Sequence, residues 1–469
     1  MIRKLSVSLM AIALAGCVNL APDHERPALA SAPAYDPEFR PDGTVVASTL
    51  SYGEWFSDPR LVSLIDTAVA NNRDLMAATA RIEQARAQFR IQDSRRLPTP
   101  VANAAATRSR TPLGSVSQGA TGSVTANRFE VGVGVSTFEL DFWGRIANLS
   151  EAARAQYLAA EANQRAFYLS LIADVASTYF ALLETEAQID LAQATVESRQ
   201  EGLRIASLRL DAGVTSALPF RQSETLLTTA EQQLAAQRLA HAQQRNQLSV
   251  LIGGSPSADL PAPLPMQAQE NGMELDPGTP SVLMLVRPDI VAAEEQLRAA
   301  RANIGAARAA FFPTISLTGN AGFASNALDN LFSSDGLSWS FGPSISLPIF
   351  DWGAREADLD LAKAREVEQV ALYEKTVQVA FREVSDALAG RRWLAEQVAA
   401  QTQGVAAQDR IAKLARLRYR EGVADYLEVL DAERNLFSAQ QQLLTTQRAF
   451  LQNGTTLFVS LGGGLAPAQ

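Results

Sequence analysis

Two stretches of the chain alternate strictly between apolar and polar residues. In the segment near 314–350, two runs place mostly apolar residues at every second position and serine, threonine, glycine or asparagine between them. A similar run covers 129–136, and a weaker one lies near 100–112. Period-two alternation predicts β-strands, so we expect hairpins at about 99–140 and 314–350. The pattern fits either a half-buried soluble sheet or barrel strands with one face in lipid. The small polar residues of the second face favour the barrel.

The stretches that follow have the pattern of helices. Residues 353–420 contain no proline, and apolar residues recur there at spacings of seven, four, three and four, a heptad-like seam: Val370, Val377, Phe381, Val384 and Leu388. At 1.5 Å per residue such a helix would be roughly 100 Å long, and 145–211 is its counterpart. Return helices are expected at 217–252 and 426–461. Shorter helices are expected to precede the hairpins, from Pro59 through Phe89 and from Pro288 to Phe311.

The two sets of elements follow one sequence pattern. Trp143-Gly144 and Trp352-Gly353 share an offset of 209 with several other pairs, and Pro98 matches Pro313 at an offset of 215. We therefore predict a tandem duplication. The expected segments are a signal peptide at 1–16, an anchored N-terminal segment at 17–57, repeat one at 58–254, a proline-rich connector at 255–280, repeat two at 281–464 and a tail at 465–469.

The N-terminus has the pattern of a secretory signal. Arg3 and Lys4 precede an apolar stretch, 5–15, that is too short to span a membrane. The single cysteine, Cys17, follows Leu14-Ala15-Gly16, which resembles a bacterial lipoprotein cleavage site. That resemblance implies a covalent lipid on Cys17, and Val18 after it favours sorting to the outer membrane. The alternative is an incidental cysteine. No run of 18 apolar residues follows.

Composition excludes several classes of function. The formal net charge is −9, which argues against a nucleic-acid partner. One cysteine and two histidines exclude a disulfide framework and leave little for a metal site. The sequence contains no motif of a known catalytic or nucleotide-binding site, so we expect no enzyme, no catalytic residue and no cofactor beyond the lipid. His24 and His241 are expected to be solvated, and Glu224 and Glu433 to be helix-surface charges.

Two hairpins supply four strands, which cannot close a barrel, and lipid does not tolerate open sheet edges. More than one chain is therefore required.

Several motifs, in this order, resemble the outer-membrane efflux protein family of TolC/OprM-type channels, in its lipoprotein branch. They are Asn19 to Pro27, Trp55-Phe56-Ser57-Asp58-Pro59, Arg287-Pro288-Asp289-Ile290, Ala306 to Pro313, Leu347 to Gly353 and Tyr426 to Ala432. The resemblance implies an α+β membrane protein: a homotrimer whose outer-membrane β-barrel, four strands per chain, continues into a long periplasmic α-helical barrel. It implies a periplasmic adaptor (membrane fusion protein) and an inner-membrane RND-type pump as partners, besides outer-membrane lipid. One departure is Ala354, which stands where the first repeat has Arg145.

The resemblance also implies site residues at the periplasmic mouth. Glu428 and Asp431 would narrow the closed pore with rings of carboxylates, and Tyr419 would tether neighbouring helices. The adaptor would dock on the turn residues Gly213, Val214, Gly422 and Val423. Simpler alternatives exist: Asp425 and Glu428 have capping-box spacing, a tyrosine can pack on a surface, and glycines commonly end helices.

The expected function is passive conduction of small molecules, drugs or toxic compounds, across the outer membrane. Two alternatives stay open: a channel for type I protein secretion, and a non-conducting coiled-coil structural lipoprotein. The sequence does not name the cargo.

Overall fold

The computed structural model of the 469-residue chain describes residues 19–28, 32–41, 43–112, 121–269 and 273–466. The chain is mostly helical, with a smaller β-part. It forms two compact units, each assembled from three segments. The first contains Met1–Pro27, Ile82–Ala160 and Ala293–Tyr373, and the second contains Ala28–Arg81, Glu161–Ala292 and Glu374–Gln469.

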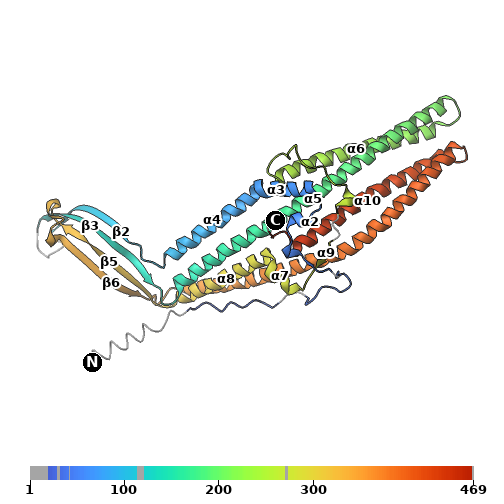
Figure 1. Cartoon of the computed structure of the whole chain (residues 1–469). Helices are drawn as coiled ribbons and strands as arrows, with labels where there is room; N and C mark the ends of the chain where they lie inside the picture. Colours follow the sequence, from blue (N-terminus) through green and yellow to red (C-terminus); the bar gives the residue numbers. More distant parts are fainter. Residues whose placement is uncertain (1–18, 29–31, 42, 113–120, 270–272, 467–469) are drawn as a thin grey trace. The chain divides into compact units, whose positions relative to one another are not determined.

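The first unit contains one antiparallel sheet of four strands (Figure 1). Its order is β2-β3-β5-β6, so each strand pairs with its neighbour in sequence, and β2 and β6 form the edges among the described residues. Their bounds are β2 (Val101–Pro112), β3 (Ser123–Leu140), β5 (Thr314–Ser325) and β6 (Leu337–Ser346). The register of β3 on β5 shifts between Val135 and Phe138.

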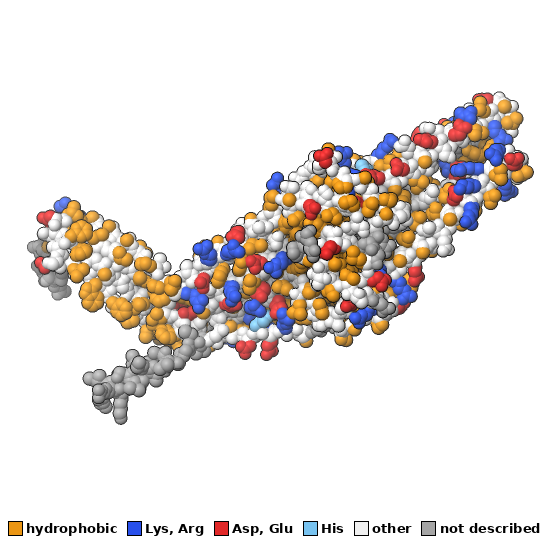
Figure 2. All heavy atoms as spheres, in the orientation of Figure 1, with side chains coloured by type: hydrophobic (Ala, Val, Ile, Leu, Met, Phe, Trp, Pro, Cys, Tyr) orange, Lys and Arg blue, Asp and Glu red, His pale blue; other side chains and the backbone are white. Residues whose placement is uncertain are grey.

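The register places apolar residues opposite apolar ones. Ile315 pairs with Ile345, and Ala321 with Trp339. Asn320 pairs with Ser340, whose hydroxyl donates a hydrogen bond to Asn320 Oδ1 at 2.9 Å. The sheet therefore has one apolar and one small polar face. The apolar face is exposed: Trp339 keeps 73% of its surface, and Figure 2 shows hydrophobic side chains spread over the strands. An exposed apolar face of this extent favours contact with lipid over a half-buried soluble sheet.

Long helices connect and follow the strands. α5 (Arg145–Asp211) and α9 (Ala354–Arg420) each have 67 residues, and α6 (Ala217–Leu251) and α10 (Tyr426–Ser460) each have 35. In the second unit α6 folds back along α5, and α10 along α9 (Figure 1). One stretch of α5 is long and apolar enough to cross a membrane, but half of that stretch is buried within the structure.

Alanine lets these helices approach closely. Ala192 and Ala230 pack with Val196 and Leu234 between α5 and α6. Ala412, Ala415 and Ala432 pack with Val429 between α9 and α10. In the first unit, a third small cluster joins α5 to α8 (Pro288–Ala309) through Ala152, Ala155, Ala299 and Ala302. Short side chains leave the backbones near one another, which suits long helices packed side by side.

The single helix expected from Pro59 to Phe89 is wrong. The structure divides it at Asn72 into α3 (Pro59–Asn71) and α4 (Arg73–Ser94). Asn72 Oδ1 accepts from the backbone N–H of Leu75 at 2.8 Å, and its Nδ2 donates to the Leu251 carbonyl at 2.8 Å. This asparagine therefore caps α4 and holds it against the end of α6.

The connector contains more structure than its prolines indicate. β4 (Leu275–Asp276) pairs in parallel with β1 (Val45–Val46), and the 3-10 helix η3 (Met266–Ala268) precedes it. The remaining short elements are η1 (Ala47–Thr49), α2 (Tyr52–Trp55), α7 (Pro280–Val286), η4 (Leu328–Asn330) and η5 (Ser334–Gly336).

Two of the family motifs serve as packing centres of the second unit. Asp58 is fully buried and accepts hydrogen bonds from Tyr179 Oη at 2.6 Å, from the Leu264 amide at 3.0 Å and from Gln269 Nε2 at 2.7 Å. Arg287 pairs with Asp289 and with Glu383 on α9, at 2.7 and 2.8 Å. Each charged side chain thus satisfies several segments at once, which offsets the cost of burying it.

Candidate functional site

The two turns that join the long and return helices have the same backbone geometry. At the end of α5, Gly213 has φ +69° and its N–H donates to the Leu210 carbonyl, while Val214 N–H donates to Arg209. At the end of α9, Gly422 has φ +75°, and Gly422 and Val423 donate to Tyr419 and Arg418. Both are Schellman motifs. The positive φ favours glycine at both positions. Steric space does not, because nothing lies within 4 Å of an added Cβ.

Each turn presents a bare apolar side chain to solvent. Val214 and Val423 both keep 66% of their surface, and Leu218 and Leu427 beside them are also exposed. Arginines of the last turns of α9 lie nearby, and Figure 2 shows basic side chains gathered at this end of α9. These exposed side chains lie at the turns where the sequence places the adaptor-docking residues Gly213, Val214, Gly422 and Val423.

The two acidic residues expected at the mouth both have arginine partners. Glu428 pairs with Arg418 at 2.6 Å, across the turn from α10 to α9. Asp431 pairs with Arg434 at 2.9 Å on α10. The alternative role of Glu428 in a capping box is wrong, since Asp425 stands at the N-cap of α10 without a side-chain cap bond. The carboxylates are half exposed, so they face water with partly compensated charge.

Tyr419 lies between helices of both hairpins. Its ring is 5.0 Å from that of Tyr426 on α10, and the guanidinium of Arg209 on α5 lies 5.0 Å from its centroid, with a hydrogen bond to its hydroxyl. Tyr426 in turn occupies the space left by Gly202 of α5, where an added Cβ would lie 2.4 Å from the Tyr426 hydroxyl. The aromatic pair therefore joins α5 to α9 and α10 close to the turns.

Glu433 is a residue that the sequence interpretation placed wrongly. Its side chain is only 13% exposed and forms ion pairs with Arg199 on α5 and with Arg416 on α9, the latter at 2.8 Å. Glu224, its counterpart at the same offset, is about half exposed and pairs with Arg221 at 2.8 Å, as a surface charge does. Helix periodicity alone does not separate these two glutamates, because Glu433 is buried by contact with α5 of the first hairpin.

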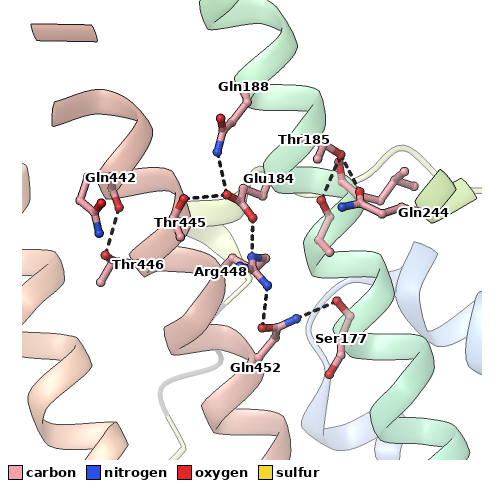
Figure 3. A network of polar contacts seen from close by, with 12 residues as sticks. Ser177, Glu184, Thr185, Gln188, Gln244, Gln442, Thr445, Thr446, Arg448 and Gln452 are labelled. Carbon is pink, nitrogen blue, oxygen red and sulfur yellow. Dashed lines mark hydrogen bonds and ion pairs between the residues drawn. The ribbon is translucent and has the colours of Figure 1, made fainter. Parts of the chain in front are cut away.

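A second polar cluster holds α10 against α5 (Figure 3). Glu184 of α5 pairs with Arg448 and accepts from Thr445 Oγ1 at 2.8 Å, and Gln188 Nε2 donates to it at 2.7 Å. Arg448 donates to Gln452, whose amide reaches the Ser177 carbonyl at 3.0 Å. Nothing in the sequence pattern predicts this cluster, since Glu and Arg on long helices usually face water. An ion pair whose glutamate is largely buried favours one register of two helices whose alanines would allow several.

The N-terminal segment lies along α8 in the first unit. Arg308 donates to the Leu20 carbonyl at 2.9 Å, and Arg301 donates to the Glu25 carbonyl at 2.6 Å. His24 and Arg26 reach Glu294 at 3.3 and 2.8 Å. Successive residues of this segment contact successively earlier turns of α8, so it runs antiparallel to the helix. We call residues 19–27 the strap.

Both histidines are less solvated than expected, His24 because it lies in the strap and His241 because it contacts α5. His24 is only 23% exposed and contacts Glu294, and His241 contacts Glu186 at 3.3 Å. Cys17 and the expected signal peptide lie outside the described residues. Among the described residues, no group of three or more His, Cys, Asp and Glu side chains could hold a metal ion.

The charges around Glu294 set its ionisation. Burial alone would raise the pKa of this carboxyl, but hydrogen bonds and positive charge from Arg26 and His24 hold it below its usual value of 4.5. The ionised form is therefore the one that binds the strap.

An antiparallel sheet with an exposed apolar face, in a chain rich in long alanine-packed helical hairpins, defines the class of outer-membrane channel proteins. Known proteins bear this out. The profile of the outer membrane efflux protein family matches residues 64–254 and 280–463. The solvent efflux pump outer membrane protein SrpC of Pseudomonas putida is 42% identical over 99% of both chains. The cation efflux system protein CusC of Escherichia coli is 38% identical over 98% of both.

A solved structure has the same fold. The open state of the MtrE outer membrane channel of Neisseria gonorrhoeae superimposes with a TM-score of 0.86 at 39% identity, covering 96% of this chain and 99% of that one. The chain belongs to the outer membrane efflux protein family. It is the outer-membrane channel component of an efflux system, and the family resemblance of the sequence motifs is confirmed.

The glycine turns generate a prediction with opposite signs on one helix. Gly422→Ala should destabilise the end of α9 by about 1 kcal/mol, because an L-residue is strained at positive φ. Gly404→Ala, in the exposed interior of α9, should stabilise the helix by up to about 1 kcal/mol. Hydrogen exchange of the Val423 amide measures the first effect, expected as about fivefold faster exchange. Equal effects at both positions would contradict the role of the left-handed turn.

The ionised Glu294 generates a pH prediction. Because its folded pKa lies below the unfolded value, its contribution to strap binding is complete above pH about 4.5 and is lost as pH falls through the lower, folded pKa. A nitroxide on Asp23→Cys, an exposed strap position, should be immobile at neutral pH and become mobile on acidification. In Glu294→Gln its spectrum should show no such step. A step that persists in the variant would assign the effect to another carboxyl.

Proposed function

We propose that three copies of this chain form one channel that passes small organic or toxic compounds across the outer membrane. The observation that carries the proposal is the sheet, whose faces are apolar and polar and whose edge strands, β2 and β6, have no second neighbour among the described residues. In hydrocarbon every backbone N–H and C=O needs a partner. Pairing of β6 with β2 of the next copy supplies it, and three copies give a twelve-stranded barrel wide enough for an aqueous lumen.

The proposed arrangement places the polar face toward water and the apolar face toward lipid. On β5 and β6 the polar face carries small serine, threonine, glycine and asparagine residues, which leave room for a lumen, and β3 adds the ion pair of Arg128 with Glu130. The hairpins α5/α6 and α9/α10 form the periplasmic part, closed side by side with those of the other copies. The two halves of the chain have the same sequence of elements, which supports a tandem duplication and a pseudo-sixfold ring.

The partners follow from the family and from the turns. A periplasmic adaptor of the membrane fusion type docks on the turns that carry Val214 and Val423, and an inner-membrane RND-type pump supplies the energy. Relatives of nearly equal identity are named for solvent and for cation efflux. Cargo that differs so much between similar channels supports selection by the pump rather than by the duct. Type I secretion and a structural scaffold are the competing assignments.

The channel proposal predicts the effect of removing the mouth carboxylates. In planar bilayers the purified protein should conduct, and the double variant Glu428→Ala, Asp431→Ala should conduct more and with less preference for cations, because fewer negative charges line the constriction. Exposed ion pairs contribute about 0–1 kcal/mol, so the fold should be retained.

Glu224→Ala is the matched control, since it removes an exposed, arginine-paired carboxylate from the other hairpin. It should leave conductance unchanged. Absence of conductance in every variant would favour the scaffold, and co-purification of an ATP-driven secretion pump in place of an RND-type pump would favour secretion.

We also propose lipidation at Cys17. Cys17→Ala should abolish incorporation of labelled palmitate, while trimers persist, because edge pairing and not the lipid closes the barrel. Radiolabelling and the mass of the detergent-solubilised protein measure the two outcomes. Trimers that disappear with the lipid would contradict this division of roles.

A further inference from the structure

The Trp-Gly pair occurs twice, and the first copy closes a join within the chain. Trp143 follows β3, and its Nε1 donates to the Pro313 carbonyl at 2.9 Å. Its indole stacks on Phe312 with ring centroids 4.6 Å apart and an interplanar angle of 22°. Phe312 and Pro313 immediately precede β5. The contact therefore lies at the end of the pairing between β3 of the first half and β5 of the second half.

The second copy of the pair has no such contact. Trp352 follows β6 and keeps 89% of its surface, and its ring meets only the edge of Phe350 at 4.7 Å among the aromatic contacts of the described residues. Trp352 is also the one non-glycine residue of the described chain with positive φ, +57°. An L-residue is strained in this conformation, and such strain persists where surroundings compensate it.

The pair that Trp143 contacts, Phe312-Pro313, also has a counterpart in the first half of the chain; we call each of the two pairs a receiving site. Leu97-Pro98-Thr99 stands at the offset of Phe312-Pro313-Thr314. The same backbone hydrogen bond forms at both: Leu97 N–H donates to the Ser94 carbonyl at 3.1 Å, and Phe312 N–H to the Ala309 carbonyl at 3.1 Å. Phe312 receives Trp143, whereas Leu97 is 71% exposed. One chain thus contains a tryptophan without its receiving site and a receiving site without its tryptophan.

We propose that Trp352 of one copy docks on Leu97 and Pro98 of the next copy in the ring. Its Nε1–H donates to the Pro98 carbonyl and its indole packs on the Leu97 side chain. The contact between copies thereby repeats the contact that Trp143 makes within the chain. It lies where β6 meets β2 of the neighbour, as the inner contact lies where β3 meets β5. This inference rests on the ring of copies put forward under Proposed function and names the side chains that specify its order.

A second copy explains more than a lipid surface does. Lipid accepts an exposed tryptophan in any backbone conformation, so it gives no reason for the left-handed φ of Trp352. Contact with lipid also does not explain why Leu97 and Pro98 match Phe312 and Pro313 in position and backbone hydrogen bonding. A defined acceptor on a neighbouring chain accounts for both.

Photocrosslinking of the full-length channel tests the proposal. The photoreactive residue p-benzoylphenylalanine replaces Trp352, and the trimer is assembled from a mixture of unlabelled and ¹⁵N-labelled chains. After illumination and trypsin digestion, adducts should fall on the peptide 97–108, and light–heavy adducts should occur at the proportion expected for random mixing. The same residue in place of Trp143 is the matched control, and its adducts with the peptide that contains Phe312 should join chains of one label only.

The outcomes are distinct. Trimers that form adducts with lipid, or with other peptides, overturn this inference and leave the proposed channel intact. A protein that is monomeric by mass in detergent overturns both.

Stability of the ring gives a second readout. Trp352→Ala should lower the temperature at which detergent separates the trimer, Trp352→Phe less so, and Leu97→Ala should add little to Trp352→Ala because the two residues share one contact. Trp339→Ala, a similarly exposed tryptophan on the apolar face of β6, should have little effect. Equal losses at both tryptophans would assign Trp352 to lipid and overturn the inference.

Discussion

Hydrogen bonding at the two edges of the sheet is the constraint on which the rest of this protein depends. Four strands pair internally, and the outward backbone groups of β2 and β6 have no strand beyond them in the described chain. Water can satisfy such groups at the surface of a soluble protein, but hydrocarbon cannot. The apolar face directs the sheet into a membrane, and the membrane makes open edges untenable. In the proposed ring of copies, assembly is therefore part of folding for the membrane portion.

In the helical part, ion pairs determine which turns of neighbouring helices lie opposite one another. Alanine-rich contacts bring helices close together, but one alanine resembles the next, so they define the register weakly. Glu184 with Arg448, and Glu433 with Arg199 and Arg416, are satisfied in one register only. Both clusters join the first half of the chain to the second. They hold the hairpin α5/α6 against the hairpin α9/α10 and oppose a shift in the register of the packed helices.

Several motifs that mark the family have packing roles within the chain. Asp58 collects three segments through hydrogen bonds, and Arg287 ties the start of α8 to α9. Arg145 pairs with Glu139 at 2.5 Å, and in the second half Arg355 pairs with Asp351 at the same distance, one residue later in the helix. The departure at Ala354 therefore preserves a basic contact at the junction of strand and helix, made from a neighbouring turn.

The sequence by itself determined the elements that depend on local rules. Alternation placed the strands, absence of proline placed the 67-residue helices, and glycine at the helix ends placed the two Schellman turns, because each depends on a residue and its near neighbours along the chain. It missed the break at Asn72, the pairing of β1 with β4, the burial of Glu433 and the contacts of His24.

Those features depend on residues far apart in sequence. Asn72 caps α4 while reaching Leu251, and Glu433 is buried only because α5 lies against α10. The two Trp-Gly pairs make the point most directly: identical in sequence, they differ because Trp143 meets Phe312 within the chain and Trp352 meets no equivalent there. Local preference is encoded in neighbouring residues, whereas burial and partnership are decided by which surfaces the tertiary structure brings together.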